Sequence, residues 1–332
     1  MNRLKTLPLL PKLINLTQID LSPGPYCMSY GFDVTLLADS IREIGLMNSP
    51  ILIEKGKGRG ETQFTVVAGF RRINAFALLG EARIPCRILP MDTPPIECLR
   101  MNLYENLIVR EFNAVEKGMA LVRLLALVPE KEVLKTFMPL FDLPSHTETL
   151  HLFVKIETEF VRFTKDLIAR GNLSLQAAKL LLEMDSISRD KFCEYFSTVM
   201  FNKNQQTQFI DYAMDLSRIE GLEITRLLDA PELLNIRDNE QMNNPQKAKA
   251  FIKLLRSRRL PHLVSTEKGF RRMVEKLALP KGCQIAAPPY FEGSHYRLEI
   301  SFETGKDLKE KLLDLSVNGR LITFDDPWNR NA

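Results

Sequence analysis

The sequence has few cysteines and little net charge, and each shortage excludes a class of protein. Its five cysteines are scattered singly along 332 residues, without a Cys-x-x-Cys pair. This spacing argues against a structural zinc site and against a disulfide framework. The formal net charge is only +4. Binding to nucleic acid therefore cannot be inferred from overall charge and must rest on local clusters of basic residues.

Long apolar runs are also absent. No segment offers the roughly 18 consecutive apolar residues of a membrane span, and the N-terminal region lacks the apolar core of a signal peptide. We therefore expect a cytoplasmic protein that has no membrane partner. The apolar fraction of 45% and the charged fraction of 26% are those of an ordinary globular protein, and the length predicts two or three domains.

A predicted strand that runs into a glycine and two arginines is the strongest functional signal present. Residues 62–68 have the composition of a strand, and Gly69-Phe70-Arg71-Arg72 opens an apolar helix that ends at Gly80. A glycine at such a turn lets a ligand approach the backbone. The free N–H groups of the first helical turn, together with two guanidinium groups, favour an anion. The segment therefore predicts a phosphate-binding site.

A second polar segment follows about thirty residues later. Glu105, Asn106 and Arg110 bring a carboxylate, an amide and a guanidinium together just ahead of a predicted helix. Asn113 and Glu116 have the spacing of a capping box, which predicts that this helix begins after Asn113.

The two segments, in this order and at this separation, resemble the paired phosphate motifs of the ParB/sulfiredoxin-like family, especially its ParB partition proteins. The family motifs read Gly-Glu-Arg-Arg and Glu-Asn-x-x-Arg. Here Phe70 replaces the glutamate and Arg110 stands one place late. The resemblance implies a mixed-sheet N-terminal domain that binds CTP with Mg²⁺. By resemblance, Glu105 would approach the metal, and the phosphates would be bound by Gly69, Arg71, Arg72, Asn106 and Arg110.

We predict an α+β protein of three domains. Residues 1–112 would form the ParB/sulfiredoxin-like nucleotide-binding domain, residues 113–240 an all-helical domain, and residues 241–332 basic helices with a small α+β domain that ends in a strand at 321–324. Within the helical domain, residues 131–157 have a helix-turn-helix pattern. Its second helix would contact DNA, with Lys155 as a candidate. The same pattern equally fits a packing or partner-binding bundle.

Basic residues also cluster between Lys247 and Lys276. Such clusters bind the phosphate backbone because each neutralised phosphate releases counterions. The alternative is an ordinary solvated helix face. The candidate DNA contacts are Lys253, Arg256, Arg258, Arg259, Lys268, Arg271 and Arg272.

The favoured function is that of a nucleoid-associated, ParB-like DNA-binding protein, acting in chromosome or plasmid partition or in a related DNA-organising role. The resemblance implies a homodimer and a partition-type ATPase as a partner. The alternatives are an enzyme of the same fold, such as a phosphoryl-transfer kinase or a nuclease, and a nucleotide-free adaptor. No catalytic residue is evident. Phe70 and Cys27-Met28-Ser29 stand where the family has its glutamate and a Gln-Pro-Arg stretch, which predicts at most weak CTPase activity. We expect Arg71 and Arg72 to serve the ligand and not the stability of the fold.

Overall fold

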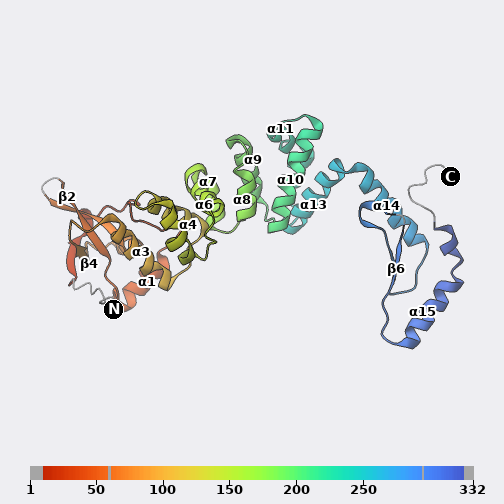
Figure 1. Ribbon diagram of the computed structural model, residues 1–332, viewed down its shortest axis with the longest axis horizontal. Coiled ribbons are helices and arrows are strands. Elements are labelled where there is room, and N and C mark those ends of the chain that lie inside the picture. The colour runs from red at the N-terminus through yellow and green to blue at the C-terminus, as the bar shows by residue number, and fades with distance from the viewer. Residues whose placement is uncertain (1–9, 59–60, 294, 325–332) are drawn as a thin grey trace. The chain divides into compact units, whose positions relative to one another are not determined.

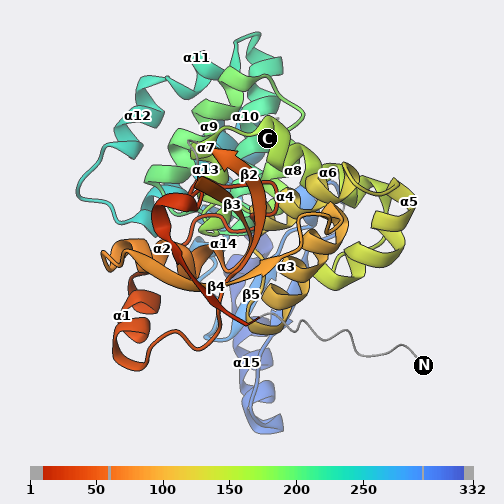
Figure 2. The same cartoon turned by 90° about the vertical axis from the view of Figure 1, so that its left-hand side faces the viewer.

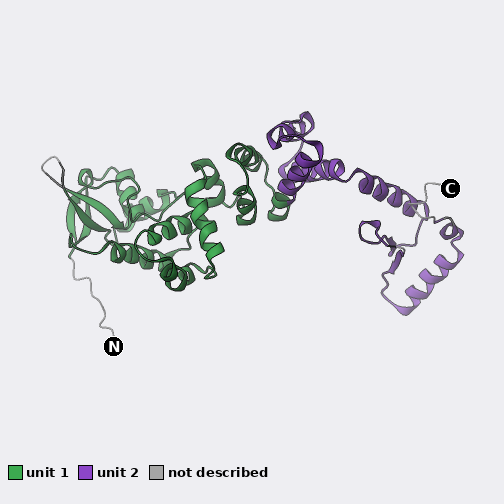
Figure 3. Ribbon diagram, turned by 45° about the horizontal axis from the view of Figure 1, so that its top comes forward, with its two compact units in different colours: residues 1–207 green, residues 208–332 purple. Residues whose placement is uncertain are grey.

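The computed structural model describes residues 10–58, 61–293 and 295–324. It divides the chain into two compact units, residues 1–207 and 208–332 (Figure 3). Its sheets and helices confirm the α+β class. The predicted division into three domains is finer than these two units and stays a prediction. Among the described residues, no helix combines the length and the apolar character that crossing a bilayer demands.

A four-stranded mixed sheet forms the start of unit 1 (Figures 1 and 2). Its order is β1-β4-β2-β3, where β2 runs antiparallel to β3 and parallel to β4, and β1 runs antiparallel to β4. The strands are β1 (Lys12–Asn15), β2 (Ile51–Gly58), β3 (Glu61–Ala68) and β4 (Arg83–Leu89). Three helices accompany them, namely α1 (Thr35–Ile44), α2 (Phe70–Leu78) and α3 (Pro95–Val109).

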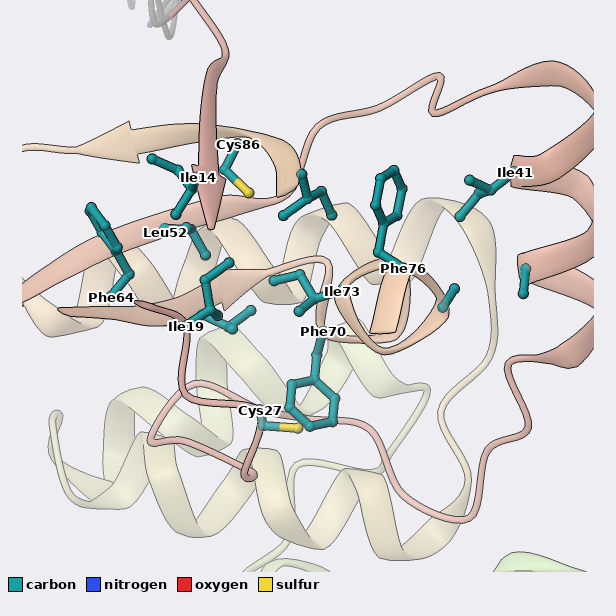
Figure 4. Close-up of a cluster of buried hydrophobic side chains, with 14 residues drawn as sticks. Ile14, Ile19, Cys27, Ile41, Leu52, Phe64, Phe70, Ile73, Phe76 and Cys86 are labelled. Carbon is teal, nitrogen blue, oxygen red and sulfur yellow. The ribbon is translucent and has the colours of Figure 1, made fainter. Parts of the chain in front are cut away.

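Successive side chains of a strand point to opposite sides of a sheet, and in this sheet the side chains of both faces are buried. Leu52 and Val66 pack with Phe70, Ile73 and other residues of α2 and α1 on one face, as Figure 4 shows for Leu52, Phe70 and Ile73. Ile53 and its neighbours face Cys98 of α3 on the other. This packing holds α2 and α3 on the two faces of the sheet, near the end of β3.

The rest of unit 1 is helical. The predicted capping box is confirmed, since the Asn113 side chain accepts from the Glu116 N–H and the Glu116 side chain accepts from the Asn113 N–H. A π-helical turn at Val133–Phe137 and a 3-10 turn at Met138–Phe141 follow α5. The α-helices are α4 (Ala114–Leu125), α5 (Glu130–Glu132), α6 (Thr147–Glu159), α7 (Arg162–Ala169), α8 (Leu175–Leu181), α9 (Ser186–Thr198) and α10 (Lys203–Glu220), the last of which continues into unit 2.

Helices α4 and α6 pack unusually close at Gly118. A Cβ atom added to Gly118 would lie 2.6 Å from the Phe153 carbonyl oxygen, a separation that no side chain could accept without moving the backbone. Glycine is therefore required for this helix crossing.

The segment predicted as a helix-turn-helix does hold helical turns, a loop and α6, with Lys155 exposed. Its DNA-reading role stays a prediction.

Unit 2 is built on α13, whose Ala248, Phe251 and Leu255 are buried at helical spacing. The expected strand at 321–324 is wrong, because the Asn318 side chain accepts from the Arg320 N–H and starts a 3-10 helix at Gly319–Thr323. The other elements are α11 (Ile224–Leu228), α12 (Pro231–Arg237), α13 (Asn244–Arg259), α14 (Pro261–Lys276), a two-stranded sheet of β5 (Cys283–Ala286) and β6 (Arg297–Ile300), a 3-10 turn (Pro289–Phe291) and α15 (Gly305–Val317).

Candidate functional site

A pocket of about 340 Å³ lies where the end of β3 meets α1, α2 and α3. One wall is apolar and comes from α1 and the loop after it, including Leu37, Ile41 and Met47. The structure brings all of the predicted nucleotide and metal residues into its lining: Gly69, Arg71, Arg72, Glu105, Asn106 and Arg110.

Gly69 forms the turn from β3 into α2 with φ 88° and ψ 25°, a left-handed conformation that favours glycine. The guanidinium of Arg72 lies against it, so that an added Cβ would be 2.9 Å from Arg72 Nη2. The first hydrogen bond of the helix runs from Ile73 N–H to the Gly69 carbonyl. The N–H groups before Ile73 have no partner within the helix and are suited to an anion.

Arg72 joins two walls of the pocket. It donates to the Asn48 carbonyl at 2.7 Å and forms an ion pair with Glu105 Oε1. The second carboxylate oxygen, Glu105 Oε2, is buried and has no hydrogen-bond partner among the described residues. A buried oxygen in this state destabilises the ligand-free site, and it fits a cation or a hydrogen-bond donor that a ligand would bring.

Glu116 holds the other two arginines. Its side chain is 1% exposed and accepts from Arg71 Nη2 at 2.9 Å and from Arg110 Nη1 at 2.6 Å. The backbone N–H groups of Tyr30 and Asn113 add bonds of 3.0 and 3.1 Å. Arg71 and Arg72 thus both form ion pairs within the fold, whereas we expected them to serve the ligand and not the stability of the fold. Their contact with a ligand phosphate stays a prediction.

The surroundings of Arg71 are partly apolar. Burial lowers the pKa of its guanidinium, and the positive charge of Arg110 lowers it further. Its guanidinium carbon lies 5.1 Å from the ring centroid of Phe32, and that ring meets Phe70 edge to face. Phe70 itself is 7% exposed and lies beside Cys27 in the core (Figure 4). The residue at the family's glutamate position is thus a packed core residue.

Arg110 reaches the pocket although it stands one place late in its motif. Helix α3 ends at Val109, and Arg110 is extended, with φ −159° and ψ 159°. This change of direction turns its side chain back, so that Nε donates to Asn106 Oδ1 at 2.8 Å and Nη2 donates to the Met28 carbonyl at 3.0 Å. Val109, which occupies the family's arginine position, is 75% exposed.

Three site residues were missed by the sequence patterns: Ser29, Glu116 as a partner of arginines, and Asn102. Asn102 is 3% exposed, and its Nδ2 donates to the carbonyls of Tyr26 at 2.7 Å and Val67 at 2.6 Å. It thereby fixes α3 to the end of β3. The only signal in the sequence that could have indicated Asn102 is a polar residue at a buried position of a helix.

Nucleophilic cysteine chemistry finds no support at this site. Cys27 is buried, and burial raises the pKa of its thiol, which disfavours the reactive thiolate. Within the described part of the chain there is also no cluster of three or more histidine, cysteine, aspartate or glutamate side chains that could hold a metal by themselves.

The predicted basic cluster of unit 2 divides into two groups. Arg256 pairs with Glu267 of α14, while Arg258 and Arg259 of α13 pair with Glu220 and Asp215 of α10, at 2.5 to 2.7 Å. These three arginines connect helices within the unit. By contrast, the side chains of Lys253, Lys268, Arg271 and Arg272 are exposed.

Residues 17–107 match the family described as the ParB N-terminal domain. Among solved structures, the chain is similar to two of the C-terminally truncated chromosome-partitioning protein ParB from Caulobacter crescentus. The complex with CTP-gamma-S has 14% identity and a TM-score of 0.26, covering 56% of this chain and 98% of that one. The complex with the centromeric parS site has 12% identity and a TM-score of 0.29, covering 65% and 96%. No curated protein matches significantly.

The Glu116 ion pairs predict that Arg71 stabilises the ligand-free fold. Arg71→Met should lower the free energy of unfolding of unit 1 by about 1–3 kcal/mol, because a buried carboxylate loses one of its donors. The matched control is Arg100→Met on α3, whose partner Glu97 is 3.5 Å away on the surface, and which should change stability by less than about 0.5 kcal/mol. Calorimetric unfolding of the full chain measures both, and equal effects of the two substitutions would contradict this assignment.

Proposed function

From the match of residues 17–107 to the ParB N-terminal domain family, we propose that the protein is a ParB-like DNA-binding protein whose pocket binds CTP with Mg²⁺. It would act in chromosome or plasmid partition or in a related organisation of DNA. The observation that carries the nucleotide part is Glu105 Oε2, a buried carboxylate oxygen without a partner among the described residues, in a pocket that also holds three guanidinium groups.

The charges of the pocket suit a phosphate chain accompanied by a cation. The guanidinium groups of Arg71, Arg72 and Arg110 face two carboxylates, which leaves a net positive charge. A phosphate group would compete with Glu105 for Arg72, while the carboxylate of Glu105 would be suited to Mg²⁺. This ion prefers one or two carboxylates together with phosphate oxygens.

The choice of CTP rests on the family resemblance, and the apolar wall of the pocket is consistent with a base and a ribose. Leu37, Ile41 and Met47 form this wall, and ligand pockets of this size are commonly lined by apolar side chains.

Calorimetric titration tests the proposal. The wild type should bind CTP with Mg²⁺, and Glu105→Gln should weaken binding by about tenfold or more when Mg²⁺ is present, because one charged ligand of the cation is removed. Glu97→Gln, on the same helix with the same 33% side-chain exposure but outside the pocket lining, is the matched control.

Hydrolysis of the bound CTP should be slow or absent. Phe70 is in the core and the chain has Cys27-Met28-Ser29 in place of the family's Gln-Pro-Arg. The carboxylate, the amide and the guanidinium that the family has at these positions, which could orient water or stabilise charge on the phosphoryl group, are therefore missing. Phosphate release is measured beside the titration. Binding without release supports the proposal, and turnover at the usual rate of ParB proteins contradicts it. Failure to bind any nucleoside triphosphate would favour the adaptor alternative.

An enzyme of another type has weaker support. A nucleophilic enzyme would need a reactive group in the pocket, and the thiol of Cys27 is buried with a raised pKa. A nuclease or kinase would need its own base beside the phosphates, and Glu105 is the one pocket carboxylate whose second oxygen is without a hydrogen bond in the described chain. The proposal assigns that oxygen to magnesium.

DNA binding is proposed for the exposed basic residues of unit 2 more than for α6. Helix α6 has Glu148, Glu157 and Glu159 against the single Lys155, so its net charge repels a phosphate backbone. The exposed Lys253, Lys268, Arg271 and Arg272 have the charge that counterion release requires.

Two sets of substitutions test this assignment. Changing Lys253, Lys268, Arg271 and Arg272 together to glutamate should reduce the slope of log affinity against log salt by up to about 3–4, since each lost phosphate contact removes about 0.9. Changing Arg256, Arg258 and Arg259 to glutamine should instead lower the melting temperature of unit 2, because their ion pairs connect its helices. An unchanged slope in the first set would make that surface an ordinary solvated face.

We further propose that the protein is a homodimer joined through the end of unit 2, with a partition-type ATPase as a partner by resemblance. The β5–β6 sheet has only two strands of four residues each, and two strands alone are marginally stable in water. Leu298 of β6 and Phe302 shortly after it are exposed, and so are Leu312 and Val317 of α15. A second copy would bury these apolar side chains.

Sedimentation of the nucleotide-free protein tests the dimer. Leu312→Glu with Val317→Glu should convert a dimer to a monomer, because charges at an apolar interface must be desolvated without partners. The control is Ile187→Glu on α9, which is 70% exposed in unit 1 and should leave the mass unchanged. A wild-type monomer at micromolar concentration would contradict the proposal.

A further inference from the structure

The segment from Met28 to Gly31 lies between the pocket and the helices that follow it. On the pocket side, Ser29 lines the cavity and its hydroxyl accepts from Arg71 Nε at 3.3 Å and from Arg110 Nη2 at 3.5 Å. The Met28 carbonyl accepts from Arg110 at 3.0 Å. Two of the three pocket arginines therefore depend on where this segment lies.

The backbone of Tyr30 belongs to the same network. Its N–H donates to Glu116 Oε1 at 3.0 Å, and its carbonyl accepts from Asn113 Nδ2 at 3.2 Å. Both partners lie at the start of α4. A shift of Tyr30 would thus change the position of the carboxylate that holds Arg71 and Arg110.

The side chain of Tyr30 turns the other way and contacts α7. Its hydroxyl donates to Asp166 Oδ1 at 2.9 Å and lies 3.2 Å from the Arg162 carbonyl. Burial, followed by the hydrogen bond and the charge of Asp166, raises the pKa of Tyr30 well above its usual range, so the hydroxyl keeps its proton at neutral pH. This bond crosses 136 residues of sequence.

Neighbouring contacts keep α7 in place. Gly31 has φ 61°, and an added Cβ would lie 3.3 Å from Ala169 Cβ, so the segment packs tightly on the helix. On its far side, Thr164 Oγ1 lies 3.4 Å from Cys193 Sγ of α9. Helix α7 is therefore held between the Tyr30 segment and α9.

We propose that Tyr30 is a positioning residue of the nucleotide pocket, through which α7 sets the affinity for the phosphate ligand. Tyr30 does not line the pocket. It acts through Glu116, whose carboxylate holds Arg71 and Arg110. The inference rests on the proposed function and adds a regulatory connection to it. Because coupling between two sites is reciprocal, any partner that displaces α7 changes ligand affinity by the same factor by which the ligand changes the binding of that partner.

Calorimetric titration of the full chain with CTP and Mg²⁺ tests the inference. Tyr30→Phe removes only the hydroxyl and should weaken binding about fivefold or more, a usual size for coupling between sites. Asp166→Ala should do the same from the helix side, whereas Asp166→Asn keeps an acceptor and should stay near the wild type. The double variant Tyr30→Phe with Asp166→Ala should bind no more weakly than either single one, because both remove the same bond. Tyr104→Phe, an exposed tyrosine on α3, is the matched control.

Hydrogen exchange supplies a second measurement that a purely structural role would not affect. Saturating CTP should alter amide exchange in α7 of the wild type, and this change should be absent in Tyr30→Phe. Wild-type binding together with an unchanged affinity of Tyr30→Phe, or strictly additive losses in the double variant, overturns the inference and leaves the proposed function intact. Absence of CTP binding by the wild type overturns both.

Discussion

The buried carboxylate of Glu116 is the interaction on which the first half of the chain depends. A charge with 1% exposure must be paired or it destabilises the fold by several kcal/mol. Its donors come from four places: the first turn of α2, the residue after α3, the segment before α1 and the start of α4. The Glu116 carboxylate therefore connects these four parts of the chain in the folded state. The pocket arginines are positioned by the stability of the fold, before any ligand is present.

The two carboxylates that pair with the pocket arginines are in opposite states. Glu116 accepts four hydrogen bonds, whereas Glu105 has one oxygen paired with Arg72 and the other buried without a partner in the described chain. Moving Arg71 or Arg110 away from Glu116 would leave its buried carboxylate with one hydrogen-bond donor fewer. Displacing Arg72 from Glu105 costs less, because the Glu105 side chain is 33% exposed and water can reach it, whereas the Glu116 side chain is 1% exposed. An incoming anion would therefore rearrange the α3 side of the pocket first and leave the α4 side in place.

Local features of the site could be predicted from the sequence, and contacts across the chain could not. The strand-to-helix turn at Gly69 and the capping box at Asn113 depend on neighbours within four residues, and the structure has both. The bond between Arg71 and Glu116 spans 45 residues, and nothing in the spacing of either residue indicates the other. The arginines of α13 look like a phosphate-binding cluster for the same reason, since their acidic partners lie on separate helices. The predicted strand at 321–324 failed because the Asn318 cap outweighed the strand propensity of the four residues after Arg320.

The close crossing at Gly118 makes α4 and α6 behave as a single stiff arm. The Phe153 carbonyl lies directly against Gly118, so at this point the backbones of the two helices are in contact and a displacement of one is passed to the other. Helix α4 has 12 residues, or about 18 Å at 1.5 Å per residue, so a tilt of roughly 5° at its first turn would move its far end by about 1.5 Å. Asn113 caps the first turn of this arm and bonds to Glu116, the partner of two pocket arginines. A small displacement at the pocket would thus arrive enlarged at the surface that α6 presents.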